Sequence, residues 1–219
     1  MDNMKIEVIG ENKCNEVENV VGITTRKVFT IEYKDIILRE FQLEDLDAIY
    51  LLTLEKEIRR FQPDWIATKE KRREWLMKYE LRENNEFIES VPNVPNIKRH
   101  TLRLGIILRE TNELIGWINS GLKDELPPPN REIGYAISKD YRSRGYATQA
   151  VQGLIKYMFE NTNVDVLNAT ALTYNAPSNK VIQKCGFMLM GKMVIENEDY
   201  FYYKLNKSEW EKNKGVIKR

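Results

Sequence analysis

The last third of the chain alternates between strand-like and helix-like patterns, and this order constrains the fold more than any other feature. The run REIGYAIS at 131–138 is typical of a strand, and residues 147–161 have apolar side chains at the spacing of an amphipathic helix. Four further elements follow: a strand at 164–174, a short helix at 178–185 that ends before Gly186, and strands near 187–195 and 200–205. This order predicts an α/β (α+β) fold on a central, mixed and mostly antiparallel sheet.

The first half adds shorter elements. The β-rich run KVFTIEYKDIILREF predicts a hairpin around Lys34 and Asp35, a helix follows Glu44, and Thr68 is a suitable N-cap for a second helix. Pro92 and Pro95 favour a loop over 84–100, before strands at 102–108 and 113–121. We expect about seven strands flanked by helices in a single domain of residues 1–219, comprising an extension at 1–30, a core at 31–206 and a tail at 207–219.

Charge and cysteine content narrow the function classes. The formal net charge is +1, which disfavours general binding to nucleic acid because such proteins have a basic excess. Cys14 and Cys185 are far apart and His100 is the single histidine, so we expect neither a disulfide framework nor a metal site. The sequence has no apolar run long enough to span a membrane and no secretory signal at its start, which favours a cytoplasmic protein with no membrane partner.

The stretch between the 131–138 strand and the following helix has the chemistry of an anion site. A helix N-terminus exposes backbone N–H groups that have no partner within the helix, and the helix dipole adds partial positive charge there. Gly145 allows a ligand to approach the backbone closely, and Ala147 keeps the first turn slim. Arg142 and Arg144 add side-chain charge that suits phosphate. We therefore predict a pyrophosphate cradle at this position.

The motif Arg142-x-x-Gly145-x-Ala147 resembles the acetyl-CoA signature of the GNAT superfamily of N-acetyltransferases. Its context is similar too, because Asn-Ala-Pro-Ser at 175–178 follows the next strand and Lys-Cys-Gly-Phe at 184–187 closes the next helix. The combination resembles the branch that includes the ribosomal-protein N-terminal (alanine/serine) acetyltransferases, over about residues 35–206. The resemblance implies the GNAT fold, with the 131–138 and 164–174 strands side by side but splayed.

The resemblance also implies how acetyl-CoA is held as the acetyl donor. The backbone of Ile137 and Ser138 would pair with the pantetheine arm, and Asn175 would contact the same arm. A backbone N–H of the 131–138 strand would polarise the thioester carbonyl. The pyrophosphate would lie against the residues of the cradle, which are Arg142, Ser143, Arg144, Gly145, Tyr146, Ala147 and Thr148.

The residues that handle protons are less obvious. The attacking amine must be neutral, and Glu132 is our candidate base; alternatively it pairs with Arg131 or is solvated. Many family members have a tyrosine four residues before the glycine of the Gly-Phe pair, as the acid that protonates the leaving thiolate. This chain has Ile182 there, so the resemblance points instead to Ser178, which alternatively only caps its helix.

The resemblance suggests an amine acceptor, and we favour a protein or peptide N-terminal α-amine. A small-molecule amine such as a polyamine, an amino acid or an antibiotic is the alternative, and a strongly acidic acceptor pocket would favour a polyamine. A non-catalytic acetyl-CoA-binding sensor is a further alternative from another class. Homodimers are common among proteins of this kind, so a homodimer is a possible assembly.

Overall fold

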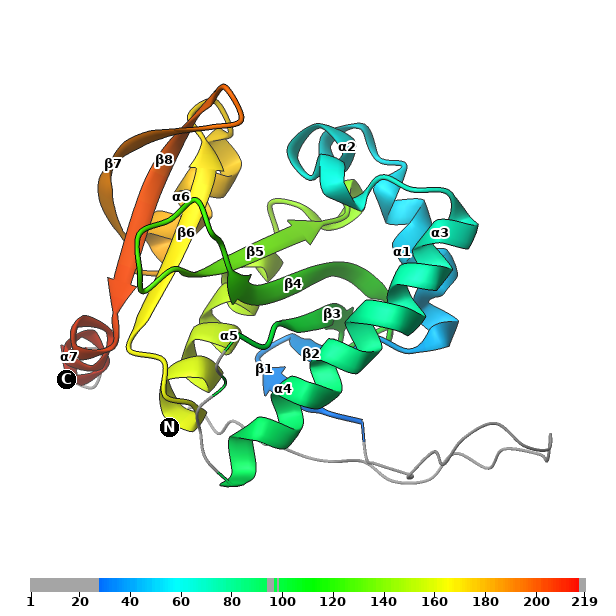
Figure 1. Cartoon of the computed structure of the whole chain (residues 1–219), viewed down its shortest axis with the longest axis horizontal. Coiled ribbons are helices and arrows are strands. Elements are labelled where there is room, and N and C mark those ends of the chain that lie inside the picture. The colour runs from blue at the N-terminus through cyan, green and yellow to red at the C-terminus, as the bar shows by residue number, and fades with distance from the viewer. Residues whose placement is uncertain (1–27, 94–96, 98, 217–219) are drawn as a thin grey trace.

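The computed structural model describes residues 28–93, 97 and 99–216, and its centre is one eight-stranded sheet (Figure 1). The strand order is β1-β2-β3-β4-β5-β6-β8-β7, and every neighbouring pair is antiparallel except β5 and β6, which are parallel. The strands are β1 Thr30–Tyr33, β2 Ile36–Glu40, β3 Leu102–Leu108, β4 Leu114–Leu122, β5 Arg131–Ile137, β6 Val166–Leu172, β7 Met188–Ile195 and β8 Glu198–Asn206. The predicted mixed, mostly antiparallel sheet is confirmed, with eight strands instead of about seven.

Seven α-helices are described. They are α1 Leu46–Thr53, α2 Lys56–Phe61, α3 Lys69–Trp75, α4 Leu81–Asn93, α5 Tyr146–Asn161, α6 Ala176–Lys184 and α7 Lys207–Val216. A π-helical segment, Leu76–Glu80, joins α3 to α4. Thr68 caps α3 as predicted, since its side chain accepts a hydrogen bond from the backbone of Lys71.

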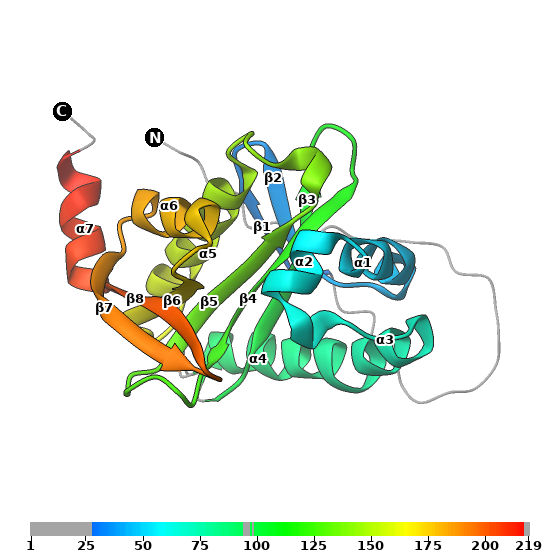
Figure 2. The ribbon, with the colours of Figure 1, turned by 90° about the horizontal axis from the view of Figure 1, so that it is seen from above.

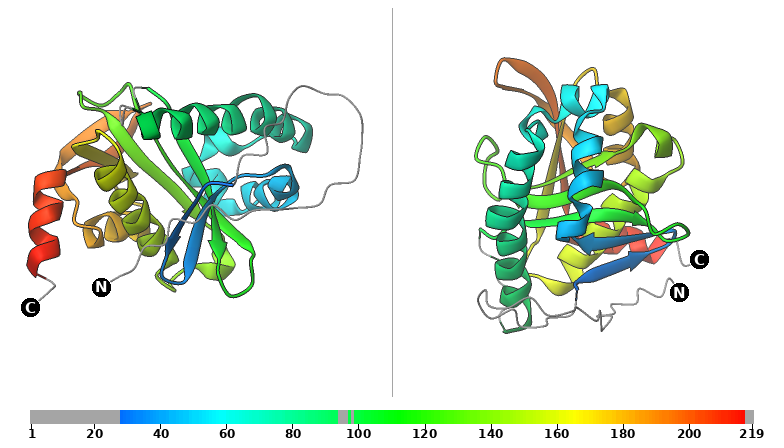
Figure 3. Two further views of the ribbon diagram at one scale, coloured as in Figure 1. Left: turned by 90° about the horizontal axis from the view of Figure 1, so that it is seen from below. Right: turned by 90° about the vertical axis from the view of Figure 1, so that its right-hand side faces the viewer.

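Helices cover both faces of the sheet (Figures 2 and 3). Successive strand residues point to opposite faces, so Trp117 and Ala136 belong to one apolar cluster and their neighbours Ile118 and Ile137 to the other. The first cluster packs against α1, α2 and the segment that follows α3. The second contains the buried side of α5, which contacts β1, β2 and β5. This arrangement fixes α2 and the N-terminus of α5 on either side of the end of β5.

The parallel strands β5 and β6 pair at one point only and then diverge. Their single register pair is Glu132 with Asn168, whereas β4 and β5 stay paired along the full length of β5. Asn168 is fully buried and its side-chain amide donates to the carbonyl oxygens of Pro129, at 2.8 Å, and Arg131, at 3.0 Å. The predicted splayed pair is therefore confirmed, and buried hydrogen bonds anchor its closed end.

One sequence prediction was wrong and one helix was not predicted, both for tertiary reasons. The segment predicted as a loop over 84–100 is helical as far as Asn93, because Asn84 and Phe87 are buried against the sheet. The Asn84 side chain bonds both backbone groups of Arg103, each at 2.7 Å, and so ties α4 to β3. The helix that was not predicted is α7, which lies within the segment at 207–219 that was given only as a tail, and its Trp210 packs against Phe159 of α5 with ring centroids 5.3 Å apart. The ambiguous segment at 1–27, including Cys14, lies outside the described residues.

Candidate active site

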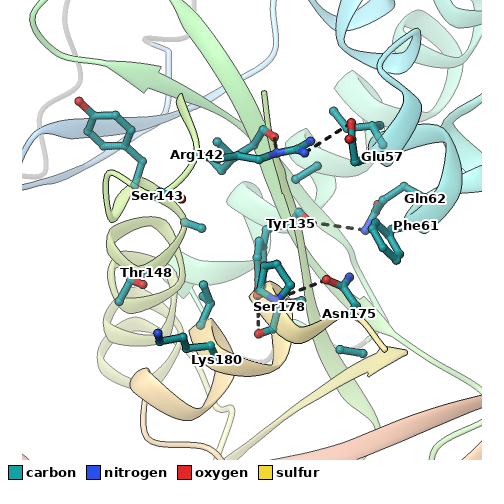
Figure 4. Close-up of a pocket in the computed structure, with 18 of the residues that line it drawn as sticks. Glu57, Phe61, Gln62, Tyr135, Arg142, Ser143, Thr148, Asn175, Ser178 and Lys180 are labelled. Atoms are coloured by element: carbon teal, nitrogen blue, oxygen red, sulfur yellow. Dashed lines mark hydrogen bonds and ion pairs between the residues drawn. The ribbon is translucent and has the colours of Figure 1, made fainter. Parts of the chain in front are cut away.

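A cavity of about 540 Å³ opens where β5 and β6 diverge (Figure 4). Its walls are α2, β5, the end of β6, the first turn of α5 and the first turns of α6. In the close-up, Ser143 and Thr148 lie on one side, Phe61 and Gln62 lie on the opposite side, and Tyr135 and Ser178 lie between them. The cavity therefore has one end at the predicted anion cradle and another end bordered by aromatic side chains.

The cradle has the backbone geometry that an anion site needs. Gly145 is the N-cap of α5 with φ of 85°, and a Cβ built on it meets nothing within 4 Å. Its carbonyl oxygen accepts the first intrahelical bond, from the backbone N–H of Gln149 at 3.0 Å. The backbone N–H groups of the first turn of α5, up to Thr148, therefore have no partner within the helix. Six of the seven predicted cradle residues line the cavity: Arg142, Ser143, Gly145, Tyr146, Ala147 and Thr148.

The two cradle arginines differ in their surroundings. The Arg144 guanidinium does not line the cavity and lies 5.6 Å from the ring centroid of Tyr141. Arg142 faces the cavity, and its Nε donates to the carbonyl oxygen of Ile137 at 3.1 Å. Its terminal nitrogens lie 3.4 Å from a Glu55 carboxylate oxygen and 3.6 Å from one of Glu57. A bound anion would therefore share Arg142 with these two carboxylates.

Glu55 connects α2 to the cradle loop. It occupies the extended N-cap position of α2, and its carboxylate accepts from Ser138 Oγ at 2.7 Å and from the backbone N–H of Lys139 at 2.8 Å, besides its contact with Arg142. Glu55 has no local sequence signal, because its partners lie more than 80 positions away along the chain. The loop that begins the cradle is thus held by a nearly buried carboxylate from the opposite wall.

Replacing Glu55 with alanine is expected to lower the free energy of unfolding by about 1.5–3 kcal/mol, because charge-assisted hydrogen bonds are lost and their donors are left in a desolvated site. Urea denaturation measures this change. Glu57→Ala is the matched control on the same helix, since its side chain is 48% exposed and pairs with Arg142 at 3.6 Å. We expect that variant to stay within about 0.5 kcal/mol of the wild type. Equal losses in the two variants would contradict the special role of Glu55.

The predicted pantetheine contacts need one correction. Both backbone groups of Ser138 are engaged within the protein: its N–H donates to the Ile115 carbonyl at 2.8 Å, and its carbonyl accepts from Tyr141 at 3.0 Å. Backbone groups alternate in direction along a strand, so the N–H groups of Ile137 and Tyr135 point away from β4, toward the gap between β5 and β6. The backbone N–H groups that face the gap are therefore those of Ile137 and Tyr135, whereas the carbonyl oxygens of these two residues accept from Arg142 and Gln62.

Glu132 lies at the closed end of the gap, one hydrogen bond from the cavity. Thr170, which lines the cavity, donates its hydroxyl to the Glu132 carboxylate, and Lys123 Nζ lies 3.5 Å from the other carboxylate oxygen. Burial raises the pKa of Glu132 above its ordinary value, and the charge of Lys123 and the bond from Thr170 oppose this rise. The alternative partner Arg131 points elsewhere and donates to the carbonyl oxygens of Ser120 and His100.

The first turn of α6 places Ser178 in the cavity. The N-cap is Asn175, whose side chain accepts from the backbone N–H of Ser178 at 3.3 Å, so the capping role that we considered for Ser178 belongs to Asn175. The next residue, Asn179, donates to the Leu172 carbonyl at 3.0 Å and accepts from the Tyr203 hydroxyl at 2.8 Å. Ile182 is 1% exposed and packs in the core, so that position does not face the cavity.

Tyr135 is a cavity residue that the sequence analysis missed. Its hydroxyl lies 2.9 Å from Ser178 Oγ and 3.2 Å from the Ser178 carbonyl oxygen (Figure 4). Burial raises the pKa of the phenol above its ordinary value. The sequence signal was an aromatic residue in the strand just before the cradle motif, which is equally typical of an ordinary strand residue.

Known proteins match this arrangement. A family model described as an acetyltransferase (GNAT) domain matches residues 35–188. The chain belongs to the GNAT acetyltransferase family. One relative, the uncharacterized N-acetyltransferase YnaD of Bacillus subtilis (strain 168), is 28% identical over 186 residues, which cover 82% of this chain and 98% of that protein. The predicted family and its N-acetyltransferase class are thus confirmed.

Two solved structures of GNAT enzymes share the fold but differ in the substrates that their titles name. RimL, described as a ribosomal L7/L12 alpha-N-protein acetyltransferase, matches with a TM-score of 0.65 at 18% identity and covers 86% of this chain and 99% of its own. The aminoglycoside acetyltransferase AAC(6')-Ib, solved with coenzyme A, also has a TM-score of 0.65, at 16% identity, and covers 82% of this chain and 99% of its own. The GNAT fold therefore does not determine the acceptor.

Among residues 28–93, 97 and 99–216, no helix is long and apolar enough to cross a bilayer. Within the same ranges, no group of three or more His, Cys, Asp or Glu side chains is arranged to hold a metal ion.

Proposed function

We propose that this GNAT enzyme transfers the acetyl group of acetyl-CoA to an amine by direct attack, without an acetylated enzyme. The observation that supports this most strongly is the open N-terminus of α5 at Gly145, next to the free edge of β5. An anion cradle and an unpaired strand edge suit the pyrophosphate and the amide-bearing arm of coenzyme A, respectively. Solved neighbours of the same fold were obtained with coenzyme A or acetyl-CoA, which supports the same donor here.

The chemistry follows from the order of groups along the cavity. A backbone N–H at the free edge of β5 stabilises the oxyanion that forms when the amine attacks the thioester carbonyl. Glu132 accepts the proton of the amine through Thr170 or water, and its raised pKa makes it a stronger base than an exposed glutamate. Ser178, which lines the cavity, is the residue that the resemblance implies for protonating the leaving thiolate.

For the acceptor we propose a protein or peptide N-terminal α-amine. Within the described residues, Glu57 is the one acid among the charged side chains lining the cavity, beside Arg142, Lys180 and Lys184. A polycation would find few partners there, whereas an α-amine with an uncharged backbone needs none. The end of the cavity opposite the cradle has the aromatic side chain of Phe61, and outside the cavity lining Tyr174 lies with its ring centroid 6.2 Å from that of Phe61. A cytoplasmic setting belongs to this proposal and agrees with the free thiol of Cys185.

A thiol-release assay with acetyl-CoA tests the proposal. The acceptor panel contains peptides with free N-termini, polyamines, amino acids and aminoglycosides, so the same experiment separates the peptide acceptor from the small-molecule alternative. Turnover confined to the peptides is the expected result. Tight binding of acetyl-CoA with no turnover on any amine would instead favour a non-catalytic sensor.

The Glu132→Gln variant is expected to lose about 10²–10⁴-fold in kcat/KM for a peptide acceptor at pH 7, the usual contribution of a general base. Because burial raises the pKa of Glu132, the wild-type rate rises with pH along a limb that lies above the ordinary glutamate range. The variant lacks that limb. Its deficit shrinks as the pH passes about 7.7–8.0, where an α-amine loses its proton unaided.

A pH profile of kcat/KM, measured for the wild type and for Glu132→Gln, checks this result. Glu89→Gln, at an exposed position of α4, is the matched control and should follow the wild-type profile. A Glu132→Gln enzyme with the wild-type rate at pH 7 would assign the carboxylate a structural role.

A further inference from the structure

The leaving thiolate needs a proton donor, and the position that supplies one in many family members is closed here. Ile182 is buried in the core, so that position presents no side chain to the cavity. The centre of the cavity nevertheless contains two hydroxyl groups in contact, those of Tyr135 and Ser178, at 2.9 Å (Figure 4). They come from β5 and α6, the two elements between which the donor arm would pass.

The phenol is the better placed of the two to give up a proton. A phenol is intrinsically far more acidic than an alkyl hydroxyl, and Tyr135 is rooted in the strand whose free edge is offered to the donor. Burial raises the pKa of the phenol and keeps it protonated at neutral pH, whereas the hydrogen bond with Ser178 opposes this rise. The backbone of Ser178 is held by the Asn175 cap, and the next residue, Asn179, is held by Leu172 and Tyr203, so the Ser178 hydroxyl extends from a fixed turn beside the phenol.

We propose that Tyr135 is the catalytic proton donor to the leaving thiolate and that Ser178 is its positioning residue. The inference rests on the proposed function and assigns the step that the Ser178 prediction left to serine alone. In the resting geometry the phenolic O–H has two acceptors within reach, the Oγ and the carbonyl oxygen of Ser178. A thiolate is a stronger acceptor than either, because hydrogen bonds to ionised groups are stronger, so the O–H turns to the sulfur as charge develops.

Acetyl transfer then proceeds with one bond formed and one broken. The amine nitrogen forms its bond to the acetyl carbon, and the bond from that carbon to sulfur breaks with its electron pair on sulfur. The sulfur takes the proton of Tyr135 and leaves as the free thiol of coenzyme A. The proton lost by the new amide nitrogen passes through Glu132 to water, and water returns a proton to the phenolate, with Ser178 Oγ donating to the phenolic oxygen in the meantime.

Comparing two acetyl donors tests this assignment. With acetyl-CoA, Tyr135→Phe is expected to lose about 10²–10⁴-fold in kcat/KM, the usual contribution of a general acid. With an acetyl thioester of an aromatic thiol, which leaves without protonation, the same variant should lose less than about tenfold relative to wild type on that donor. Calorimetry should give wild-type affinity for coenzyme A, because the phenol hydroxyl acts on the sulfur and not on the phosphates.

The controls separate the possible outcomes. Tyr157→Phe removes a buried phenol of α5 that does not line the cavity, and it should follow the wild type on both donors. Equal losses on both donors, or weakened coenzyme A binding, would overturn the catalytic role of Tyr135. If Ser178→Ala lost more kcat/KM on acetyl-CoA than Tyr135→Phe and regained it on the aromatic thioester, serine would be the proton donor. A wild-type enzyme inactive toward every amine would overturn the proposed function itself, whereas an active wild type with an unimpaired Tyr135→Phe overturns only this inference.

Discussion

Gly145→Glu is expected to lower the affinity for acetyl-CoA by more than about 100-fold, the largest effect on binding that we expect from one substitution. The glycine has φ of 85° and open space where its Cβ would be, so a glutamate side chain projects toward the cradle without a clash. Its carboxylate would face the pyrophosphate, and like charges in contact cost several kcal/mol, about 3 kcal/mol corresponding to 100-fold. Calorimetric titration with coenzyme A measures the loss, and acetyl transfer should fall in parallel.

Two controls isolate the charge from the backbone. Gly145→Ala keeps the positive φ and the open space, so it reports only the strain of a side chain in that conformation, about 1–2 kcal/mol. Gly191→Glu introduces the same side chain at another glycine with positive φ, on β7 and away from the cavity, where a Cβ also meets nothing within 4 Å. It should leave coenzyme A affinity unchanged. Wild-type affinity in Gly145→Glu would show that the pyrophosphate binds elsewhere.

The sequence predicted most of the fold because its strongest signals are local. The stripe of apolar side chains on α5, the alternation along β3 and β5, and the glycine after α6 each reflect a period or a backbone conformation that a short window contains. The loop predicted in place of α4 and the unpredicted helix α7 concern elements held by distant partners. Asn84 bonds the backbone of β3, and Trp210 rests on Phe159, so α4 and α7 are stabilised by contacts that no window reveals.

The same difference between local signals and distant contacts explains which residues of the candidate site could be predicted. The cradle is one contiguous motif at a helix entrance, and six of its predicted residues line the cavity together. Glu55 and Tyr135 could not be predicted because each contacts a residue far along the chain, Glu55 contacting Arg142 and Tyr135 contacting Ser178. The backbone direction at Ser138 was also out of reach, since it depends on the register of β5 against β4.

A second large effect is expected on stability, at the buried ion pair of α3 and the π-helical segment. Arg72 and Glu80 form a side-chain ion pair with 2% and 7% of their side chains exposed. The Arg72 guanidinium lies 4.9 Å from the ring centroid of Trp65 and 5.3 Å from that of Trp75. Burial, with the nearby charge of Arg103, lowers the pKa of Arg72 to about 10, which still leaves it charged at neutral pH. The pair is thus desolvated, charged and enclosed by aromatic rings.

Arg72→Met is expected to lower the free energy of unfolding by about 3–5 kcal/mol, because Glu80 then remains as a buried carboxylate without a partner. Chemical denaturation at pH 7 measures the loss. The double variant Arg72→Met/Glu80→Met removes both charges and should come within about 1 kcal/mol of wild type, since apolar side chains often replace a buried pair without loss. The present pair favours that recovery, because Arg72 Nε and Glu80 Oε2 lack hydrogen-bond partners among the described residues.

Packed side chains connect this ion pair to the cavity wall, so acetyl transfer provides a second measurement of the predicted effect. Trp65 stacks on Trp117 with centroids 4.1 Å apart, and Trp117 shares its cluster with Ile58 of α2 and Ala136 of β5, both of which line the cavity. Disorder around Arg72 therefore reaches the acceptor wall, so acetyl transfer in the single variant should fall and should return in the double variant. A double variant as unstable as the single one would show that the guanidinium matters through its packing between the tryptophans and not through its charge.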